Sequence, residues 1–320
     1  MPAILTHYIA GQAVLNNLAP EICKKIKPCE QLYNIGTQGP DIFFYHIPGS
    51  LRKHLRGIGG HMHKNNLGLF LLQMAKEAKA ASTTCNAVFS YTAGFIMHYL
   101  VDSHTHPYVY AKTEKTGASK IENSTCHHKF ETAIDIAMLK IFSNKKPASY
   151  KLWELINADM AQITEASTAT SAAIRTVYDR PVSPKDVRKA MRYMVQIVRL
   201  IQSRRGKRKK LIGLTEKLLL GHPLNASIIH DQDIDNSIDY LNAKNQPWQA
   251  PWENASSTDS FLDRYQAAVN EGLQIIQMLH DYVYEGSQTK GLQIEELQAK
   301  LGNRSLKTGQ PCGTASCQPS

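Results

Sequence analysis

A ladder of ionisable side chains inside an apolar segment constrains the fold of this chain more than any other feature. Residues 85–107 are mostly apolar, but they carry His98, Asp102 and His106 at intervals of four. Residues four apart on an α-helix differ by only about 40° around the axis, so these side chains share one face. Burying three ionisable groups costs several kcal/mol unless they pair or bind a metal. The segment therefore predicts a buried helix with a metal-binding stripe.

The remaining sequence predicts an all-α fold. Apolar residues recur at spacings of three and four, and alternating runs typical of strands are scarce. At 320 residues and 42% hydrophobic, the chain can bury a sizeable core. We expect the ladder helix to stop at Pro107, because proline disfavours α geometry in the residue before it. Other helices are expected at 6–18, 20–26, 61–81, 122–142, 150–177, 184–204, 209–220, 258–284 and 294–301, with irregular segments at 50–60 and 112–119.

The composition along the chain suggests three regions. We expect a metal-binding helical core at 1–147, a helical second half packed on it at 148–285, and a polar tail at 286–320 that is disordered from Ser305 onward. The net charge is +10, and much of the excess lies at 204–210. That basic run is either a solvated helix end or a patch for a membrane or nucleic acid. The N-terminus lacks the features of a secretory signal, and no apolar run is long enough to span a membrane, so we expect a cytoplasmic protein.

Further candidate metal ligands lie outside the ladder. Eight of the thirteen histidines fall between His54 and His128. His127 and Glu131 are one helical turn apart on the apolar face of their predicted helix, where a single ion can reach both. Taken singly, each candidate has an ordinary alternative as a helix cap, a turn residue or a surface side chain. Together they form a ligand set suited to zinc, and the remaining candidates are His7, Asp41, and either His61 or His63.

The order of these pieces carries a family resemblance. His7 is followed by Gly-Pro-Asp at Asp41, by Met-His at His63, by His-x-x-x-Asp-x-x-x-His-Pro-Tyr from His98, and by His-x-x-x-Glu from His127. In this order the sequence resembles the zinc-dependent phospholipase C family, over residues 1–142. The resemblance implies a multi-helix domain of the kind that this family shares with zinc-dependent single-strand nucleases, here with a helical C-terminal extension.

The resemblance also implies two or three zinc ions and a ligand for each position. One ion would be held by His98, Asp102, Asp41 and His63, and Asp102 would bridge to a second ion held by His7. A third ion would be held by His106, His127 and Glu131. Asp41 is the candidate catalytic residue, since it could both bind metal and orient the attacking water. His61 remains an alternative to His63, and His104 and His128 are expected outside the ligand set. Secreted members of the family also use the amino group of their first residue, which Pro2 could supply here.

These features predict a zinc-dependent hydrolase of phosphate esters, similar to phospholipase C, acting on a phospholipid at a membrane surface. One alternative is a single-strand nuclease, with Trp248 and Trp252 as stacking platforms for bases. Another is hydrolysis of a small soluble phosphodiester. A third is a structural or interaction protein that binds metal without turnover, because its ions lack an open position.

Overall fold

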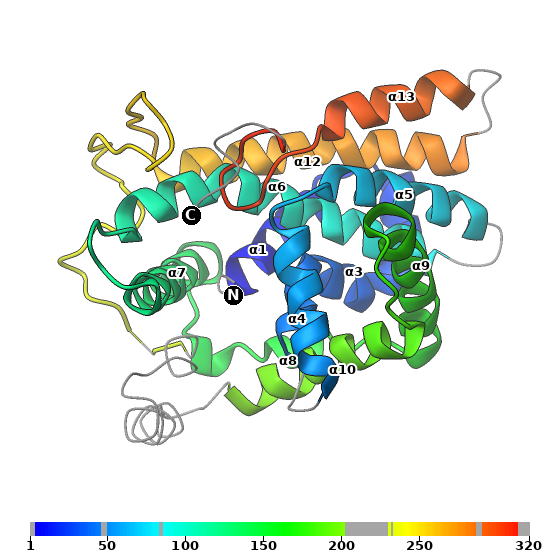
Figure 1. The fold of residues 1–320 in the computed structure, drawn as a ribbon, viewed down its shortest axis with the longest axis horizontal. Helices are drawn as coiled ribbons and strands as arrows, with labels where there is room; N and C mark the ends of the chain where they lie inside the picture. Colours follow the sequence, from blue (N-terminus) through cyan, green and yellow to red (C-terminus); the bar gives the residue numbers. More distant parts are fainter. Residues whose placement is uncertain are drawn as a thin grey trace.

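Helix α6 (Ala87–Thr113) contains the predicted ladder and lies at the centre of the fold. The structure, a computed structural model, describes residues 4–45, 50–82, 86–201, 230–231, 233–285 and 290–312. Throughout these residues it contains twelve α-helices and no β-strand, so the prediction of an all-α protein is confirmed. Nearly every side chain of α6 is buried, because several helices of the fold pack against it. Figure 1 shows its place among them.

The neighbours of α6 come from both halves of the chain. The closest packing is with α12 (Phe261–Tyr284), which runs alongside α6 in Figure 1, and with α3 (Glu30–Gly36). Helices α5 (Leu67–Ala81) and α9 (Met160–Tyr178) pack on it as well. The other elements are α1 (Ile4–Leu15), α2 (Pro20–Ile26), η1 (Lys27–Cys29), η2 (Gly39–Tyr45), α4 (Ser50–Met62), α7 (Lys120–Ser143), η3 (Pro147–Ser149), α8 (Leu152–Leu155), α10 (Pro184–Ile201) and α13 (Lys290–Leu301).

The predicted end of the ladder helix at Pro107 is wrong. The helix continues through this proline to Thr113. A proline inside a helix removes one hydrogen bond and clashes with the carbonyl four residues earlier, here that of Ser103. Burial of Tyr108 and Val109 on the following turn favours continuation despite this cost. As a result, His106 stays on the same helical face as Asp102.

The segment before the ladder also differs from the prediction. Residues 50–60 were expected to be irregular, but they form most of α4. Leu55, Ile58 and Met62 recur at helical spacing and are buried, and this apolar stripe outweighs the glycines. The helix expected at 61–81 begins only at Leu67, after Asn66 with a positive φ of 52°.

Two further boundaries need correction. The helix expected at 150–177 is broken into α8 and α9, and Asp159 caps the second by accepting hydrogen bonds from the backbone of Ala161 and Gln162. The expected disorder from Ser305 is wrong for residues 305–312, which pack against α6 with Leu306 fully buried. The helix at 209–220, the basic run at 204–210 and residues 313–320 lie outside the described residues. No helix in the described ranges is long and apolar enough to cross a membrane.

Candidate metal centre

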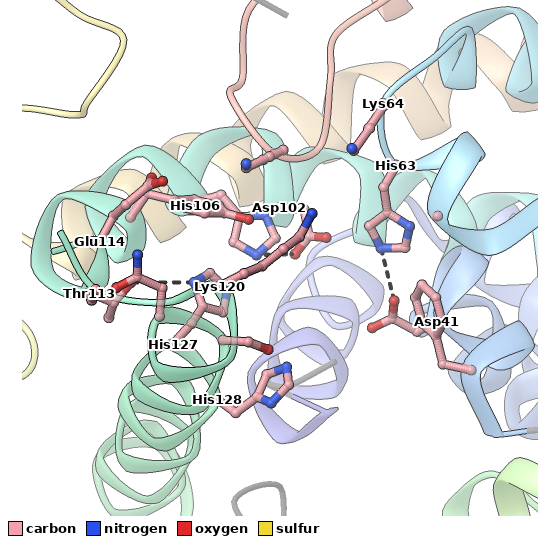
Figure 2. A pocket seen from close by; sticks show the side chains of 17 residues that line it. Asp41, His63, Lys64, Asp102, His106, Thr113, Glu114, Lys120, His127 and His128 are labelled. Carbon is pink, nitrogen blue, oxygen red and sulfur yellow. Dashed lines mark hydrogen bonds and ion pairs between the residues drawn. The ribbon is translucent and has the colours of Figure 1, made fainter. Parts of the chain in front are cut away.

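All eight predicted ligands converge around the middle of α6. They come from five places in the chain: α1, η2, the residue after α4, α6 and α7. A cavity of about 590 Å³ opens beside them. Figure 2 shows its lining, which includes Asp41, His63, Asp102, His106 and His127. The other three ligands, His7, His98 and Glu131, are almost fully buried next to these residues.

Asp102 is the central carboxylate of the site. Its Oδ1 lies 2.9 Å from Nε2 of His7 and 3.8 Å from Nε2 of His106, and its Oδ2 lies 3.2 Å from Nε2 of His98. The two oxygens therefore face different histidines. This arrangement fits a carboxylate that bridges two positive centres, as the resemblance implies for Asp102.

Asp102 forms a first group with His7 and His98. Asp41 and His63 form a second group that also includes His98. His63 Nε2 lies 2.9 Å from Asp41 Oδ1. The approach of η2 to α6 depends on Gly39, since a Cβ there would collide with the His98 ring and its φ is +48°. Nδ1 of His98 lies 3.2 Å from the Thr37 carbonyl, so only Nε2 is available to bind a metal ion. His98 can therefore bind an ion in one of the two groups but not in both.

The third group lies between α6 and α7. Oε1 of Glu131 is 3.2 Å from Nε2 of His106 and 3.0 Å from Nε2 of His127. The one-turn spacing of His127 and Glu131 on α7 places both side chains toward His106. The structure thus brings together the three residues that the resemblance assigns to a separate ion.

Most of these imidazoles are oriented by acceptors on their Nδ1 side. His63, His98 and His106 have Nδ1 at 2.7, 3.2 and 2.6 Å from the backbone carbonyls of Gly59, Thr37 and Leu306. A carbonyl can only accept, so each neutral ring carries its proton on Nδ1 and presents the lone pair of Nε2 to the site. This outer support is typical of histidines that bind metals.

Electrostatics favour ionised carboxylates. Burial alone would raise the pKa of Asp102, but the charges of His106, His98 and His7 hold it well below its usual range. Burial would likewise raise the pKa of Asp41, but His63 lowers it. Burial lowers the pKa of His98. The site therefore offers charged oxygens and at least one neutral imidazole, the forms that a metal ion requires.

The donor set fits zinc. His98 Nε2 and Glu131 Oε2 are buried, and neither has a hydrogen-bond partner in the described part of the chain. Leaving buried polar atoms unsatisfied costs about 1–3 kcal/mol each, so such atoms call for a further partner. Imidazole nitrogens with carboxylate oxygens are the ligands that zinc takes in catalytic sites.

The histidines outside the ligand groups have other surroundings. His61 packs its ring against Tyr178, so the structure brings His63 rather than His61 to the site. His104 lies 2.7 Å from Glu271 on α12 and belongs to none of the groups. His128 lines the cavity, where burial lowers its pKa to about 3. Pro2, the possible source of an amino ligand, lies outside the described residues.

Asp135 supports the site but was not assigned a role from the sequence. Its fully buried carboxylate accepts hydrogen bonds from the backbone N–H groups of Leu5 and Thr6 and from the Thr6 hydroxyl, and it lies 2.7 Å from His230. These N–H groups belong to the first turn of α1, which has no carbonyl partners for them within the helix. Asp135 therefore anchors the turn that carries His7.

Residues 303–312 form a strap over the cavity. Leu306 accepts from His106 Nδ1 through its carbonyl and donates its N–H to the His63 carbonyl at 2.9 Å. A Cβ at Gly309 would collide with the carbonyl oxygen of Ser103, which Pro107 leaves without its helical partner. The strap thus contacts the segments that carry two of the predicted ligands.

We expect Gly309→Ala to destabilise the protein by about 1–3 kcal/mol and to weaken zinc binding at His106, since both the clash and the φ of +70° oppose an alanine. Urea unfolding and zinc titration measure the two effects. Gly117→Ala is the matched control, because Gly117 also has a positive φ but no atom near its Cβ position. Equal effects of the two variants on zinc binding would contradict the role of the strap.

The match to a family model agrees with this geometry. A model described as zinc dependent phospholipase C matches residues 6–179, more than half of the chain. The chain belongs to the zinc-dependent phospholipase C family. The predicted family is therefore confirmed, and the match extends beyond residue 142 to include α9. Helix α12 and the strap lie outside the matched range. Comparisons with curated proteins and with solved structures found no match.

Proposed function

We propose that the protein is a zinc-dependent hydrolase that cleaves a phosphodiester of a phospholipid between its glycerol and its phosphate. The observation that carries the proposal is the convergence of three His and carboxylate groups beside one cavity of about 590 Å³. Family membership supports a phospholipid-type substrate. The cavity is of a size typical of small-ligand sites, and it accommodates a head group.

The ligands assigned to zinc are His7, Asp41, His63, His98, Asp102, His106, His127 and Glu131. When bound, zinc supplies positive charge that polarises the phosphoryl group and makes a nearby water more acidic. Asp41 lines the cavity, and its lowered pKa keeps it ionised at neutral pH. Its carboxylate can accept a hydrogen bond from the attacking water and orient it toward phosphorus. The alkoxide of the glycerol leaves in line with this attack and takes up a proton.

The surroundings of Trp248 favour a phospholipid over single-stranded nucleic acid. The proposed stacking platform at Trp248 is buried in the core and donates its indole N–H to the Asp259 carbonyl at 2.9 Å. It packs edge-on against Tyr108 rather than facing the cavity. Trp252 contacts Tyr110 in a similar edge-on arrangement. A nuclease would need aromatic faces exposed to the bases.

We expect the purified protein to contain two or three zinc ions per chain and to hydrolyse short-chain phosphatidylcholine or bis(p-nitrophenyl) phosphate. Mass spectrometry of the metals and phosphate release measure the two properties. Removal of zinc with 1,10-phenanthroline should abolish turnover, and added zinc should restore it. A protein that holds zinc but turns over no phosphodiester would favour the metal-binding alternative. Cleavage of a single-stranded oligonucleotide in preference to lipid would favour the nuclease.

A further inference from the structure

Three lysines line the same cavity as the metal ligands. Lys64 follows His63, Lys120 begins α7, and Lys307 lies in the strap. Figure 2 shows Lys64 and Lys120 among the side chains around His106 and Asp102. Within the described residues, no ion pair within 4 Å involves any of these lysines. Segments far apart in the sequence thus bring unpaired positive charges to one cavity.

Lys307 is held in place rather than extended into solvent. Its Nζ lies 4.9 Å from the centre of the Tyr110 ring, a cation–π distance, and Tyr110 itself lines the cavity. Its backbone is fixed by the neighbouring Leu306, which contacts His106 and the His63 carbonyl. Burial lowers the pKa of Lys307, the nearby carboxylate of Glu114 raises it, and the charges of Lys64 and Lys120 lower it to a smaller extent. The three ammonium groups therefore line one cavity with Lys307 fixed in place beside Tyr110.

The metal groups leave little need for these lysines in binding the scissile phosphate. The eight proposed ligands include three carboxylates, and the positive charge of two divalent ions already exceeds the negative charge of these carboxylates. A phosphodiester carries a single negative charge, so the metal centre alone can neutralise it. Among the described residues that line the cavity, there is one further carboxylate, Glu114, against three lysines. The cavity therefore has an excess of positive charge that can bind a second anion.

We infer that the substrate's head group carries, besides the scissile phosphodiester, a second anionic group of the phosphate type, bound by Lys64, Lys120 and Lys307. This inference rests on the proposed function. Lysine ammonium groups bind phosphate as point charges, and three of them match its several oxygens. A quaternary ammonium head group would instead need an aromatic face, and Lys307 already occupies the face of Tyr110, one of the two aromatic rings that line the cavity in the described residues.

The test compares two head groups on the zinc-loaded, full-length protein. Short-chain phosphatidylinositol 4-phosphate has a second phosphate, and short-chain phosphatidylcholine is zwitterionic. We expect kcat/KM to be at least tenfold higher for the first lipid. The double variant Lys120→Gln/Lys307→Gln should lower this ratio at least tenfold, mainly through KM for the first lipid. Lys129→Gln, an exposed charge on the same helix outside the cavity lining, is the matched control and should leave the ratio unchanged.

Calorimetry separates this inference from the proposed function. Inositol 1,4-bisphosphate and phosphocholine are titrated into the zinc-loaded protein, and the double variant should lose at least tenfold in affinity for the bisphosphate only. Loss of this affinity without turnover of any lipid would support the lysine site and overturn the hydrolase. If the ratio of the affinities for the bisphosphate and for phosphocholine were the same in the double variant and in Lys129→Gln, the lysine site would be overturned. Deacylated glycerophosphoinositol 4-phosphate distinguishes a soluble source from a lipid source, and cleavage of either supports a second phosphate.

Discussion

Asp102→Asn is expected to lower kcat/KM for phosphodiester hydrolysis by a factor on the order of 10³. Within the described ranges, Asp102 faces histidines of two groups, because its Oδ1 lies 2.9 Å from Nε2 of His7 and 3.8 Å from Nε2 of His106. An asparagine of the same shape keeps one oxygen but loses the charge that would bridge two ions. Zinc content should therefore fall by at least one ion per chain, as measured by mass spectrometry beside the rate.

The control for this variant is Asp233→Asn, which removes an exposed carboxylate paired with Lys146 on the surface. An exposed ion pair contributes about 0–1 kcal/mol, so this control should keep full zinc content and full activity. Far-ultraviolet circular dichroism checks that Asp102→Asn remains helical. A folded Asp102→Asn protein with all its zinc and near-normal turnover would contradict a central role for Asp102.

The ladder and its partners could be predicted because their signal is local. Intervals of four place His98, Asp102 and His106 on one face of any helix, whatever the helix packs against. The same holds for His127 and Glu131. The long-range pairing of these two groups came instead from the family resemblance, since spacing within one helix says nothing of which helix lies opposite. The structure places Glu131 within 3.2 Å of His106.

Other parts of the site could not be predicted because they depend on backbone groups. The carbonyls of Gly59, Thr37 and Leu306 orient three histidines, yet every residue has such a carbonyl, so no residue type marks them. The strap was expected to be disordered on its polar composition. Its order comes from the buried Leu306 and from the fit of Gly309 against Ser103, both tertiary contacts. Continuation of α6 through Pro107 is a tertiary effect of the same kind.

A second large effect is expected at Asp135, which anchors α1 rather than binding metal. Asp135→Ala should lower the free energy of unfolding by about 3 kcal/mol or more, because it leaves the N–H groups of Leu5 and Thr6 and the Thr6 hydroxyl buried without their acceptor. His7 lies on the same turn, so zinc affinity at its group should fall as well. Urea unfolding and zinc titration measure the two losses.

Asp159→Ala is the matched control for Asp135→Ala. Asp159 also accepts backbone hydrogen bonds at the start of a helix, from Ala161 and Gln162 of α9. Unlike Asp135, it is exposed, and it contacts none of the proposed metal ligands. Loss of such a cap typically costs about 1 kcal/mol, and zinc binding should be unaffected. If Asp135→Ala lost no more stability than Asp159→Ala and bound zinc normally, α1 would be held by its apolar packing alone. If it lost both, His7 owes its position to a carboxylate 128 residues further along the chain, and a role for His7 in binding metal depends on α7 as much as on α6.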